Sequence, residues 1–335
     1  MKNHVGSKVI LYCLLIAFLV LFSSCNNTND QQDLHKIVVQ FGWLPDMHHV
    51  GFWIALNKGY YMEEGLDVQL LPGGLDSSPL KAVVSNVADI GQAGGLEQLI
   101  TAISEGLPVY AIAAFHRETP QALISLSRNP IRKPSDFAGK TIAVAFGDAA
   151  EILLKTYMIK TNIDQNEVKL VPFRFDLTPL IDGRIDAITG FSTDQPATLF
   201  DKGLSPVVLR YSDAGIRSYG YTFFCSKSTL AAKSEHIAAF LRASRRGWIY
   251  AFNHPEEAIA VMVKYFPNLK PEIEKKKFAF VRDLMCDKNG DLAEWTLKRE
   301  VVSQVIQMLS QYGTVKVSPP VDTVIDDRVL QEESK

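Results

Sequence analysis

Residues 43–52 hold the densest group of side chains with binding chemistry in this 335-residue chain. Trp43 and Phe52 offer flat aromatic faces, and the neutral imidazole of His49 can both donate and accept hydrogen bonds. The segment follows an apolar stretch at 37–41 that is typical of a strand, and it precedes a short helix whose first N–H groups are free. The pattern favours a site for a small aromatic ligand. The same residues also suit a core tryptophan and a histidine that caps a helix.

Three further segments place polar or aromatic residues where a predicted strand gives way to a helix. In an open α/β sheet, such strand ends form the ligand site. The glycines at 91–95 also let a ligand approach the backbone closely. The residues that we expect at these ends are Gln92, Glu97, Phe146, Gly147, Asp148, Phe191 and Asp194. Asp148 and Asp194 are equally suited to a purely structural role as helix N-caps.

The elements that must position these residues alternate along the chain. Short apolar strands and helical stretches follow one another in two runs, 37–115 and 141–210. This βαβα order predicts an α/β fold with mostly parallel sheets and helices on both faces. We therefore expect two lobes, the first made of 36–120 and 226–325 and the second of 121–225.

From Leu230 onward the pattern is helical, and this section should pack on the first lobe. Helices are predicted at 234–252, 256–265, 272–282 and 292–312. The chain must then cross between the lobes twice, near Gln121–Ser127 and near Tyr221–Ser226. Both segments have the composition of strands, which predicts a two-stranded hinge. Tyr219 and Tyr221 lie at the second crossing, where they either stack on a ligand or pack structurally.

The N-terminus has the features of an export signal. Lys2 and Lys8 precede an apolar run of fourteen residues, 9–22, which suits a signal core better than a membrane-spanning helix. Two small residues and Cys25 follow, as in a lipoprotein signal, although Phe22 stands where leucine is usual. We expect residues 1–24 to be a lipoprotein signal peptide, Cys25 to carry lipid, and 25–35 to be a flexible tether. The sequence also fits an uncleaved anchor helix or a plain secretory signal.

Composition excludes several classes of protein. The net charge is −2 and there is no basic patch in the sequence, so nucleic acid is not an expected partner. His48, His49 and His116 lack the spacing of a metal site, and no metal is expected. Beyond the signal and Cys25 only Cys225 and Cys286 remain, either as a disulfide or as buried free thiols.

A resemblance to a known family runs through these residues. The string Trp-x-Pro-x-x-x-His-x-Gly, which contains Trp43, Pro45 and His49, resembles the thiamine-pyrimidine-precursor branch of the nitrate/sulfonate/thiamine-precursor solute-binding superfamily. The likeness spans about residues 36 to 310, and further motifs that carry it are Pro72-Gly73-Gly74, Ala88-Asp89-Ile90-Gly91, Asp136-Phe137-Ala138-Gly139-Lys140 and Pro255-Glu256-Glu257-Ala258. It implies a type II periplasmic-binding-protein fold, ligand capture between two lobes, and an ABC permease as the membrane partner. The family's ligand contacts fall at 146–148 and 191–194.

The same superfamily contains a pyridoxal-phosphate-dependent synthase of the thiamine pyrimidine. The resemblance places Ala93 where that enzyme has the lysine that carries the cofactor, and Glu97 where it has a histidine. The enzyme's cysteine-rich motif is absent near 217–221. Because a Schiff base needs an amine, we expect neither enzymatic activity nor a cofactor.

The sequence thus predicts a monomeric, lipid-anchored receptor of an ABC importer, facing the periplasm or the cell exterior. Its expected ligand is a thiamine-pyrimidine precursor or a similar small heteroaromatic. A second hypothesis is also a binding protein of an ABC importer, but its ligand is a sulfonate, nitrate or another small oxyanion. Arg117 or Arg174 would then be the partner of the anion. Two hypotheses of a different kind are the disfavoured synthase and a binding-protein fold that serves as a sensor.

Overall fold

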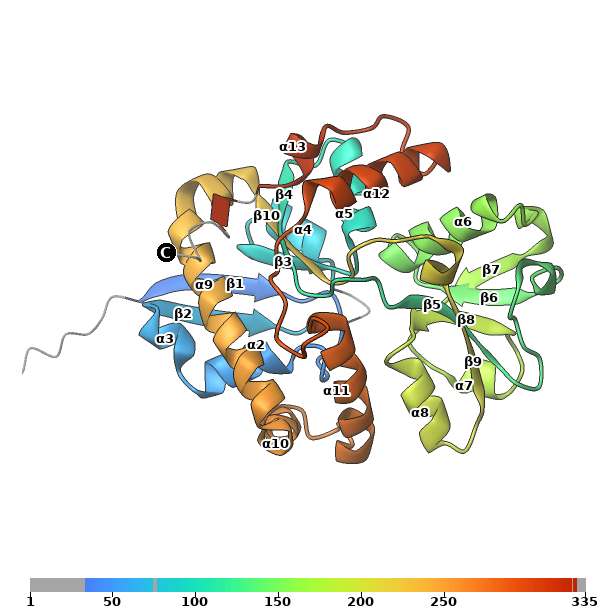
Figure 1. Ribbon diagram of the computed structural model, residues 1–335, viewed down its shortest axis with the longest axis horizontal. Coiled ribbons are helices and arrows are strands. Elements are labelled where there is room, and N and C mark those ends of the chain that lie inside the picture. The colour runs from blue at the N-terminus through green and yellow to red at the C-terminus, as the bar shows by residue number, and fades with distance from the viewer. Residues whose placement is uncertain (1–33, 75–76, 327, 330–335) are drawn as a thin grey trace, which may run out of the picture. The chain divides into compact units, whose positions relative to one another are not determined.

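The computed structural model describes residues 34–74, 77–326 and 328–329. The predicted signal, Cys25 and most of the tether lie outside these residues. Residues 34–335 form one compact unit that contains two five-stranded sheets. We call the part built on the first sheet lobe 1 and the part built on the second sheet lobe 2 (Figure 1).

The sheet of lobe 1 has the strand order β2-β1-β3-β10-β4. β1 is parallel to β2 and β3, whereas β10 is antiparallel to both of its neighbours, so four strands run in one direction and β10 in the other. Its strands are β1 (His35–Gln40), β2 (Leu66–Leu71), β3 (Ile90–Ala93), β4 (Val109–Ala114) and β10 (Thr222–Ser226).

The sheet of lobe 2 repeats this plan with the order β7-β6-β8-β5-β9. Here β5 is the reversed strand, antiparallel to β8 and β9, while β6 is parallel to β7 and β8. Its strands are β5 (Gln121–Leu126), β6 (Thr141–Val144), β7 (Lys169–Pro172), β8 (Ala187–Phe191) and β9 (Pro206–Arg210). The prediction of two mostly parallel sheets is therefore confirmed.

Helices cover both faces of each sheet. On β10, for example, Phe223 and Cys225 belong to one apolar cluster and Phe224 to another, because successive side chains of a strand point to opposite faces. The helices of lobe 2 are α6 (Ala149–Lys160), α7 (Thr178–Ile181) and α8 (Gln195–Asp201). Those of lobe 1 are α2 (Val50–Asn57), α3 (Tyr60–Glu63), α4 (Pro79–Val84), α5 (Leu96–Ser104), α9 (Lys227–Asn253), α10 (Pro255–Tyr265), α11 (Pro271–Met285), α12 (Arg299–Gln311) and α13 (Val321–Val324).

Two glycines fix where the loop after β1 enters α2. A Cβ on Gly51 would lie 2.2 Å from the ring of Trp248, and a Cβ on Gly247 would lie 2.1 Å from the carbonyl oxygen of Gly51. Only glycine permits helices to approach this closely, so α2 and α9 cross at this pair. The crossing holds the start of α2, and with it the segment that carries Trp43 and His49.

The chain passes between the lobes in two segments, 115–120 and 215–221, that run side by side. Phe115 N–H donates to Tyr221 O (3.2 Å), Thr119 N–H to Ser218 O (2.8 Å), and Gly220 N–H to His116 O (3.2 Å). The crossings predicted from the sequence, near 121–127 and 221–226, lie a few residues further along the chain. Those segments are strands, but β5 and β10 belong to the lobe sheets, and the connecting ribbon lies just before each of them.

The C-terminal section packs on lobe 1, and its last long helix begins later than the sequence predicts. The helix predicted from Leu292 begins only at Arg299. Residues 287–291 form a turn in which Asp287 accepts from Asn289 N–H and Gly290 has a φ of 85°. The backbone of Trp295 then accepts a hydrogen bond from Ala114 N–H of β4. This pairing with the sheet edge replaces the helical pattern.

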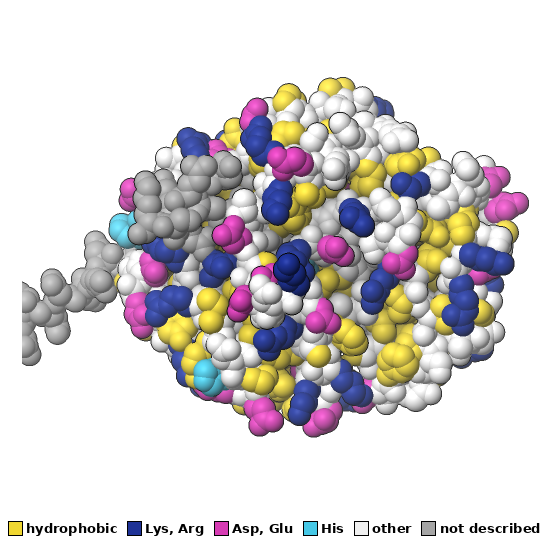
Figure 2. Space-filling view, in the orientation of Figure 1, with side chains coloured by type: hydrophobic (Ala, Val, Ile, Leu, Met, Phe, Trp, Pro, Cys, Tyr) yellow, Lys and Arg dark blue, Asp and Glu magenta, His cyan; other side chains and the backbone are white. Residues whose placement is uncertain are grey.

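Charges of both signs are interspersed on the face shown in Figure 2. Within the described part of the chain, no helix is long and apolar enough to cross a membrane. Cys225 and Cys286 are both buried and are not paired with each other.

Candidate ligand-binding site

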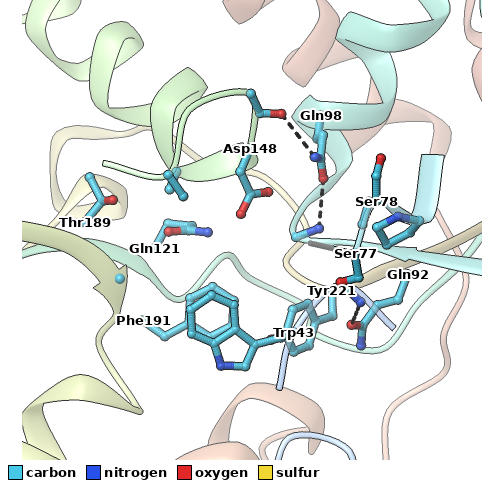
Figure 3. A pocket seen from close by; sticks show the side chains of 18 of the residues that line it. Trp43, Ser77, Ser78, Gln92, Gln98, Gln121, Asp148, Thr189, Phe191 and Tyr221 are labelled. Carbon is cyan, nitrogen blue, oxygen red and sulfur yellow. Dashed lines mark hydrogen bonds between the residues drawn. The ribbon is translucent and has the colours of Figure 1, made fainter. Parts of the chain in front are cut away.

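A cavity of about 260 Å³ lies between the two lobes, at the carboxyl ends of their parallel strands. Its size is just below the range of about 300–1,000 Å³ that is usual for small-molecule sites. The cavity has room for one small ring with short substituents. Figure 3 shows the side chains that surround it.

Lobe 1 forms one wall from the ends of β1 and β3. Gly42 and Trp43 follow β1, and Gln92 and Ala93 close β3. Close backbone packing holds this wall, because a Cβ on Gly42 would lie 2.8 Å from Gln92 O. The half-buried Trp43 therefore presents its indole to the cavity from a fixed backbone.

Lobe 2 forms the opposite wall from the ends of β6, β7 and β8. Phe146 and Asp148 follow β6, Phe173 and Phe175 follow β7, and Phe191 ends β8. Flat apolar faces thus come from both lobes, as an aromatic ligand requires.

Three buried polar atoms at the cavity have no hydrogen-bond partner within the described residues. They are Gln92 Nε2, Gln121 Oε1 and the hydroxyl of Tyr221, and all three side chains line the cavity. A buried polar atom left unpaired costs about 1–3 kcal/mol. A ligand that supplies the missing partners recovers this cost, so these atoms indicate the polar complement of the ligand.

Asp148 is the one residue with a formal charge at neutral pH among the described residues that line the cavity. It is the N-cap of α6, and its carboxylate accepts from Ala149 N–H at 2.7 Å. Burial raises the pKa of Asp148, and this hydrogen bond opposes the rise. In Figure 3 its carboxyl group points into the space between Gln121, Gln98 and the indole of Trp43. The site therefore offers an acceptor to a ligand N–H and no cation to an anion.

Seven of the residues that were predicted from the sequence line the cavity: Trp43, Gln92, Phe146, Gly147, Asp148, Phe191 and Tyr221. Five do not: Pro45, His49, Glu97, Asp194 and Tyr219. His49 is fully buried behind the wall, where its Nε2 lies 3.3 Å from Gln92 Oε1. Pro45 is buried in the loop that leads to it.

The other three predicted residues have partners within the protein. Glu97 is fully buried and accepts a hydrogen bond from Ser218, on the ribbon between the lobes. The hydroxyl of Tyr219 accepts from Lys298 N–H at 3.1 Å. Asp194 pairs with Lys277 at 2.5 Å. The structure therefore places these five residues beneath the cavity wall or away from it, and direct contact between them and a ligand stays a prediction.

Sequence reasoning missed several residues that line the cavity: Ser77, Ser78, Gln98, Gln121, Phe173, Phe175, Thr189 and Gln195. The strand-end rule, applied also to the segments after β2 and β7, would have found Ser77, Ser78, Phe173 and Phe175. Gln98 lies in the first turn of α5, where its Oε1 accepts from Gly94 N–H and its Nε2 donates to Gly147 O across the lobes.

Phe175 has an unusual backbone. Its φ of 58° lies in the left-handed region, where a bulky aromatic residue is an outlier. Such strain persists only where the surroundings fix it and is common at ligand sites. Here the ring of Phe175 contacts Trp43 edge-to-face.

Three histidines and an aspartate lie together behind the cavity. His48 Nδ1 is 3.5 Å from His116 Nε2, and His49 Nδ1 is 3.3 Å from Asp46 Oδ1. Burial lowers the pKa of both His48 and His116, so both rings are neutral near pH 7. Among the described residues, no group of three or more His, Cys, Asp or Glu side chains has the arrangement of a metal site.

Two α/β lobes joined by a two-segment ribbon, with a cavity at the strand ends between them, define the architecture of a periplasmic-binding-protein fold. The periplasmic aliphatic sulphonate-binding protein SsuA of Escherichia coli aligns with 88% of this chain and 92% of its own, with a TM-score of 0.68 and 14% identity. This likeness confirms the predicted periplasmic-binding-protein fold.

The family model described as NMT1/THI5-like matches residues 46–258, which is more than half of the chain. The chain therefore belongs to the NMT1/THI5-like family, and the resemblance found in the sequence is confirmed.

Relatives of known name differ in what they do. A formylaminopyrimidine-binding protein of Halalkalibacterium halodurans is 27% identical over 87% of this chain and 91% of its own. The riboflavin-binding protein RibY of Chloroflexus aurantiacus is 24% identical over 71% and 69%. The 4-amino-5-hydroxymethyl-2-methylpyrimidine phosphate synthase of Legionella pneumophila is 25% identical over 72% and 78%. The family thus includes both binding proteins and enzymes.

Proposed function

We propose that this chain is the solute-binding subunit of an ABC importer and that it captures an aminopyrimidine or a similar one-ring heteroaromatic. One observation carries the proposal: the cavity combines the indole of Trp43 with a single carboxylate, Asp148, and with unpaired polar atoms on Gln92, Gln121 and Tyr221. A flat ring stacks on the indole while its amine donates to Asp148 or Gln121, and a ring nitrogen accepts from Gln92 Nε2. The name of the relative from Halalkalibacterium halodurans is consistent with this ligand class.

The charge of the cavity argues against an oxyanion as the ligand. The described residues that line it include no lysine, arginine or histidine, and Arg117 and Arg174 are exposed elsewhere on the molecule. An anion in this cavity would be desolvated next to Asp148 without a cation to pair with, which is unfavourable.

The same lining supports a role without catalysis. Ala93 lies at the cavity, and no amine for a Schiff base is present among the described lining residues. We expect that pyridoxal phosphate mixed with the purified protein forms no stoichiometric adduct that borohydride can reduce. Mass spectrometry of the reduced protein checks this, and a single modified lysine at the cavity would overturn the assignment.

The remaining parts of the proposal concern location and motion. We propose a lipid anchor at Cys25, a tether to about residue 35, and two lobes, 36–120 with 226–325 and 121–225, that close as a monomer on the ligand. A membrane-bound ABC permease would then receive the ligand. Loss of uptake of a labelled aminopyrimidine on deletion of the gene separates this function from that of a sensor.

The ligand class is tested by thermal shift and calorimetry of the purified protein with formylaminopyrimidine, riboflavin, an alkanesulfonate and nitrate. A ligand at about 100 times its Kd stabilises the folded state by about 2.7 kcal/mol. We expect this stabilisation from formylaminopyrimidine. Stabilisation by the sulfonate or by nitrate, with none from the pyrimidine, would reject the proposal.

A further inference from the structure

A buried ammonium group lies where the two lobes meet, behind the cavity. Lys277, on α11 of lobe 1, is 8% exposed. Its Nζ lies 3.3 Å from Glu274 Oε1 and 3.6 Å from Asp46 Oδ2 of the same lobe, and 2.5 Å from Asp194 Oδ1 of lobe 2. Buried lysines are rare unless paired, and this one has carboxylate partners on both sides of the cleft.

From Lys277 a chain of polar contacts leads into the wall of lobe 2. Asp194 Oδ2 accepts from Gln195 Nε2 at 2.8 Å, and Gln195 Oε1 accepts from Phe191 N–H at 2.7 Å. Gln195 and Phe191 both line the cavity. A Cβ on Gly190 would lie 2.3 Å from Gln195 Oε1, so the Gln195 side chain has little freedom.

A second chain of contacts leads into the wall of lobe 1. Asp46 Oδ1 lies 3.3 Å from His49 Nδ1, and His49 Nε2 lies 3.3 Å from Gln92 Oε1. Both neighbours of the ring are acceptors, so a neutral imidazole can donate to only one of them. Gln92 Oε1 also accepts from Gly42 N–H at 3.1 Å, which leaves Gln92 Nε2 directed at the cavity without a partner among the described residues. The contacts that start at Lys277 thus lead towards two glutamines, Gln195 and Gln92, which line opposite walls of the cavity.

We propose that Lys277 is a positioning residue for ligand binding: it joins the lobes in the closed arrangement by pairing with Asp46 and Asp194 together, and through Asp194 it orients Gln195 at the cavity. This inference rests on the proposed function. The sequence predicted Asp194 and His49 as ligand contacts, but both side chains are directed away from the cavity. Each lies next to a glutamine that lines it, Gln195 for Asp194 and Gln92 for His49.

Electrostatics indicate what the loss of Lys277 does. Without its ammonium group, Asp46 of lobe 1 faces Asp194 of lobe 2 and lacks the cation that pairs with both, whereas burial raises the pKa of the neighbouring Glu274 to about 7, so this carboxyl adds less charge. The other titratable groups that face them are His48, His49, His116 and Tyr221. Like charges that are buried together repel strongly, so the lobes should separate. Because only the closed form makes both sets of ligand contacts, opening lowers the apparent affinity.

The test compares Lys277→Met with Lys276→Met, the same chemical change one residue earlier on the exposed face of α11. Small-angle scattering of the ligand-free protein should give a larger radius of gyration for Lys277→Met and an unchanged one for the control. Calorimetry with formylaminopyrimidine should give a Kd raised at least about tenfold for Lys277→Met, which corresponds to about 1.4 kcal/mol.

A second variant separates charge repulsion from a loss of packing. In Lys277→Met with Asp194→Asn, the side chain of residue 194 in lobe 2 no longer presents a negative charge to Asp46 of lobe 1. The double variant should therefore scatter as a more compact particle than Lys277→Met alone and should recover part of the affinity. A purely structural role of Lys277 predicts no such rescue. Asp194→Asn alone, which breaks the same ion pair from lobe 2, decides the matter if Lys277→Met does not fold.

The two proposals fail in different ways. If formylaminopyrimidine binds no form of the protein, the ligand proposal is wrong, and scattering still reports on Lys277. If Lys277→Met and Asp194→Asn both scatter and bind as the unmodified protein does, Lys277 does not position the lobes and the inference is overturned.

Discussion

The rings of Trp43 and Phe175 meet edge-to-face across the two lobes, with centroids 4.2 Å apart and planes at 89°. Trp43 follows the first strand of lobe 1, and Phe175 follows β7 of lobe 2. The contact therefore exists only while the lobes are close together. Both side chains also line the cavity, so the contact lies at the place where a ligand would bind.

Trp43→Ala should weaken the binding of formylaminopyrimidine at least tenfold. The ring pairing alone is worth about 0.5–1.5 kcal/mol beyond area burial, and the lost burial adds to it. Stability should change little, since the side chain is only half-buried. Trp248→Ala is the matched comparison, because its fully buried side chain should cost about 3–5 kcal/mol of stability. Unchanged affinity together with a large loss of stability in Trp43→Ala would show that Trp43 is a core residue.

Asp148→Asn tests the carboxylate. Asparagine is as good an N-cap as aspartate, so α6 should keep its stability while the charge is lost. We expect calorimetry to give a Kd for formylaminopyrimidine that is higher by at least about tenfold, because loss of a hydrogen bond to a charged group costs about 1.5–3 kcal/mol. Asp164→Asn removes the charge of another capping aspartate far from the cavity and should leave the Kd unchanged. Equal affinities of the two variants would count against Asp148 as a ligand contact.

Glu97 should make stability depend on pH. Burial raises the pKa of Glu97 from 4.5 to about 7, the hydrogen bond from Ser218 opposes this, and the charge of Asp148 adds to it. Between these pH values the folded state keeps a proton that the unfolded chain releases. The stabilisation is therefore complete below pH 4.5 and is lost as the pH rises through about 7.

Glu97→Gln should accordingly change stability little at about pH 5 and raise it, relative to the unmodified protein, at about pH 8. The upper limit is about 3 kcal/mol at about 1.36 kcal/mol per pKa unit. Thermal melts at both pH values measure the difference. Glu105→Gln, at the exposed end of the same helix, is the control and should show no such dependence. A difference for Glu97→Gln that is the same at both pH values would contradict the raised pKa.

Cys25→Ser should release the protein from the membrane fraction or leave its signal uncleaved, because the acylated thiol is the proposed anchor. Fractionation and intact-mass measurement check both outcomes. Cys225→Ser, which alters a buried free thiol, should leave the fractionation unchanged. A Cys25→Ser protein that is still processed and membrane-bound would refute the lipoprotein proposal.

Much of the fold follows from the sequence because its signals are local. Alternating strands and helices predict two mostly parallel sheets, and the run of helices after Leu230 predicts the layer that packs on lobe 1. The start of α12 was missed because the pairing of Trp295 with Ala114 is a long-range contact that no local pattern contains.

The site divides in the same way. Trp43, Gln92 and Asp148 were found because they lie at or just after the ends of strands of the sheets. His49 and Asp194 also follow strands, yet their side chains turn away, toward Gln92 and Lys277. Which way a side chain turns depends on partners from distant segments, and here the decisive one is a lysine on α11, far along the chain from Asp194. Only the three-dimensional structure brings these groups together.

The ribbon between the lobes has a mechanical consequence. Three backbone hydrogen bonds join residues 115–120 to residues 215–221. The two segments should therefore bend together rather than independently. Two segments joined in this way bend less easily within their common plane than across it. The proposed closure should then be a rotation of the lobes about one axis. Each closure would bring Trp43 back into contact with Phe175. Side chains at the strand tips can change, and with them the ligand, without altering that path.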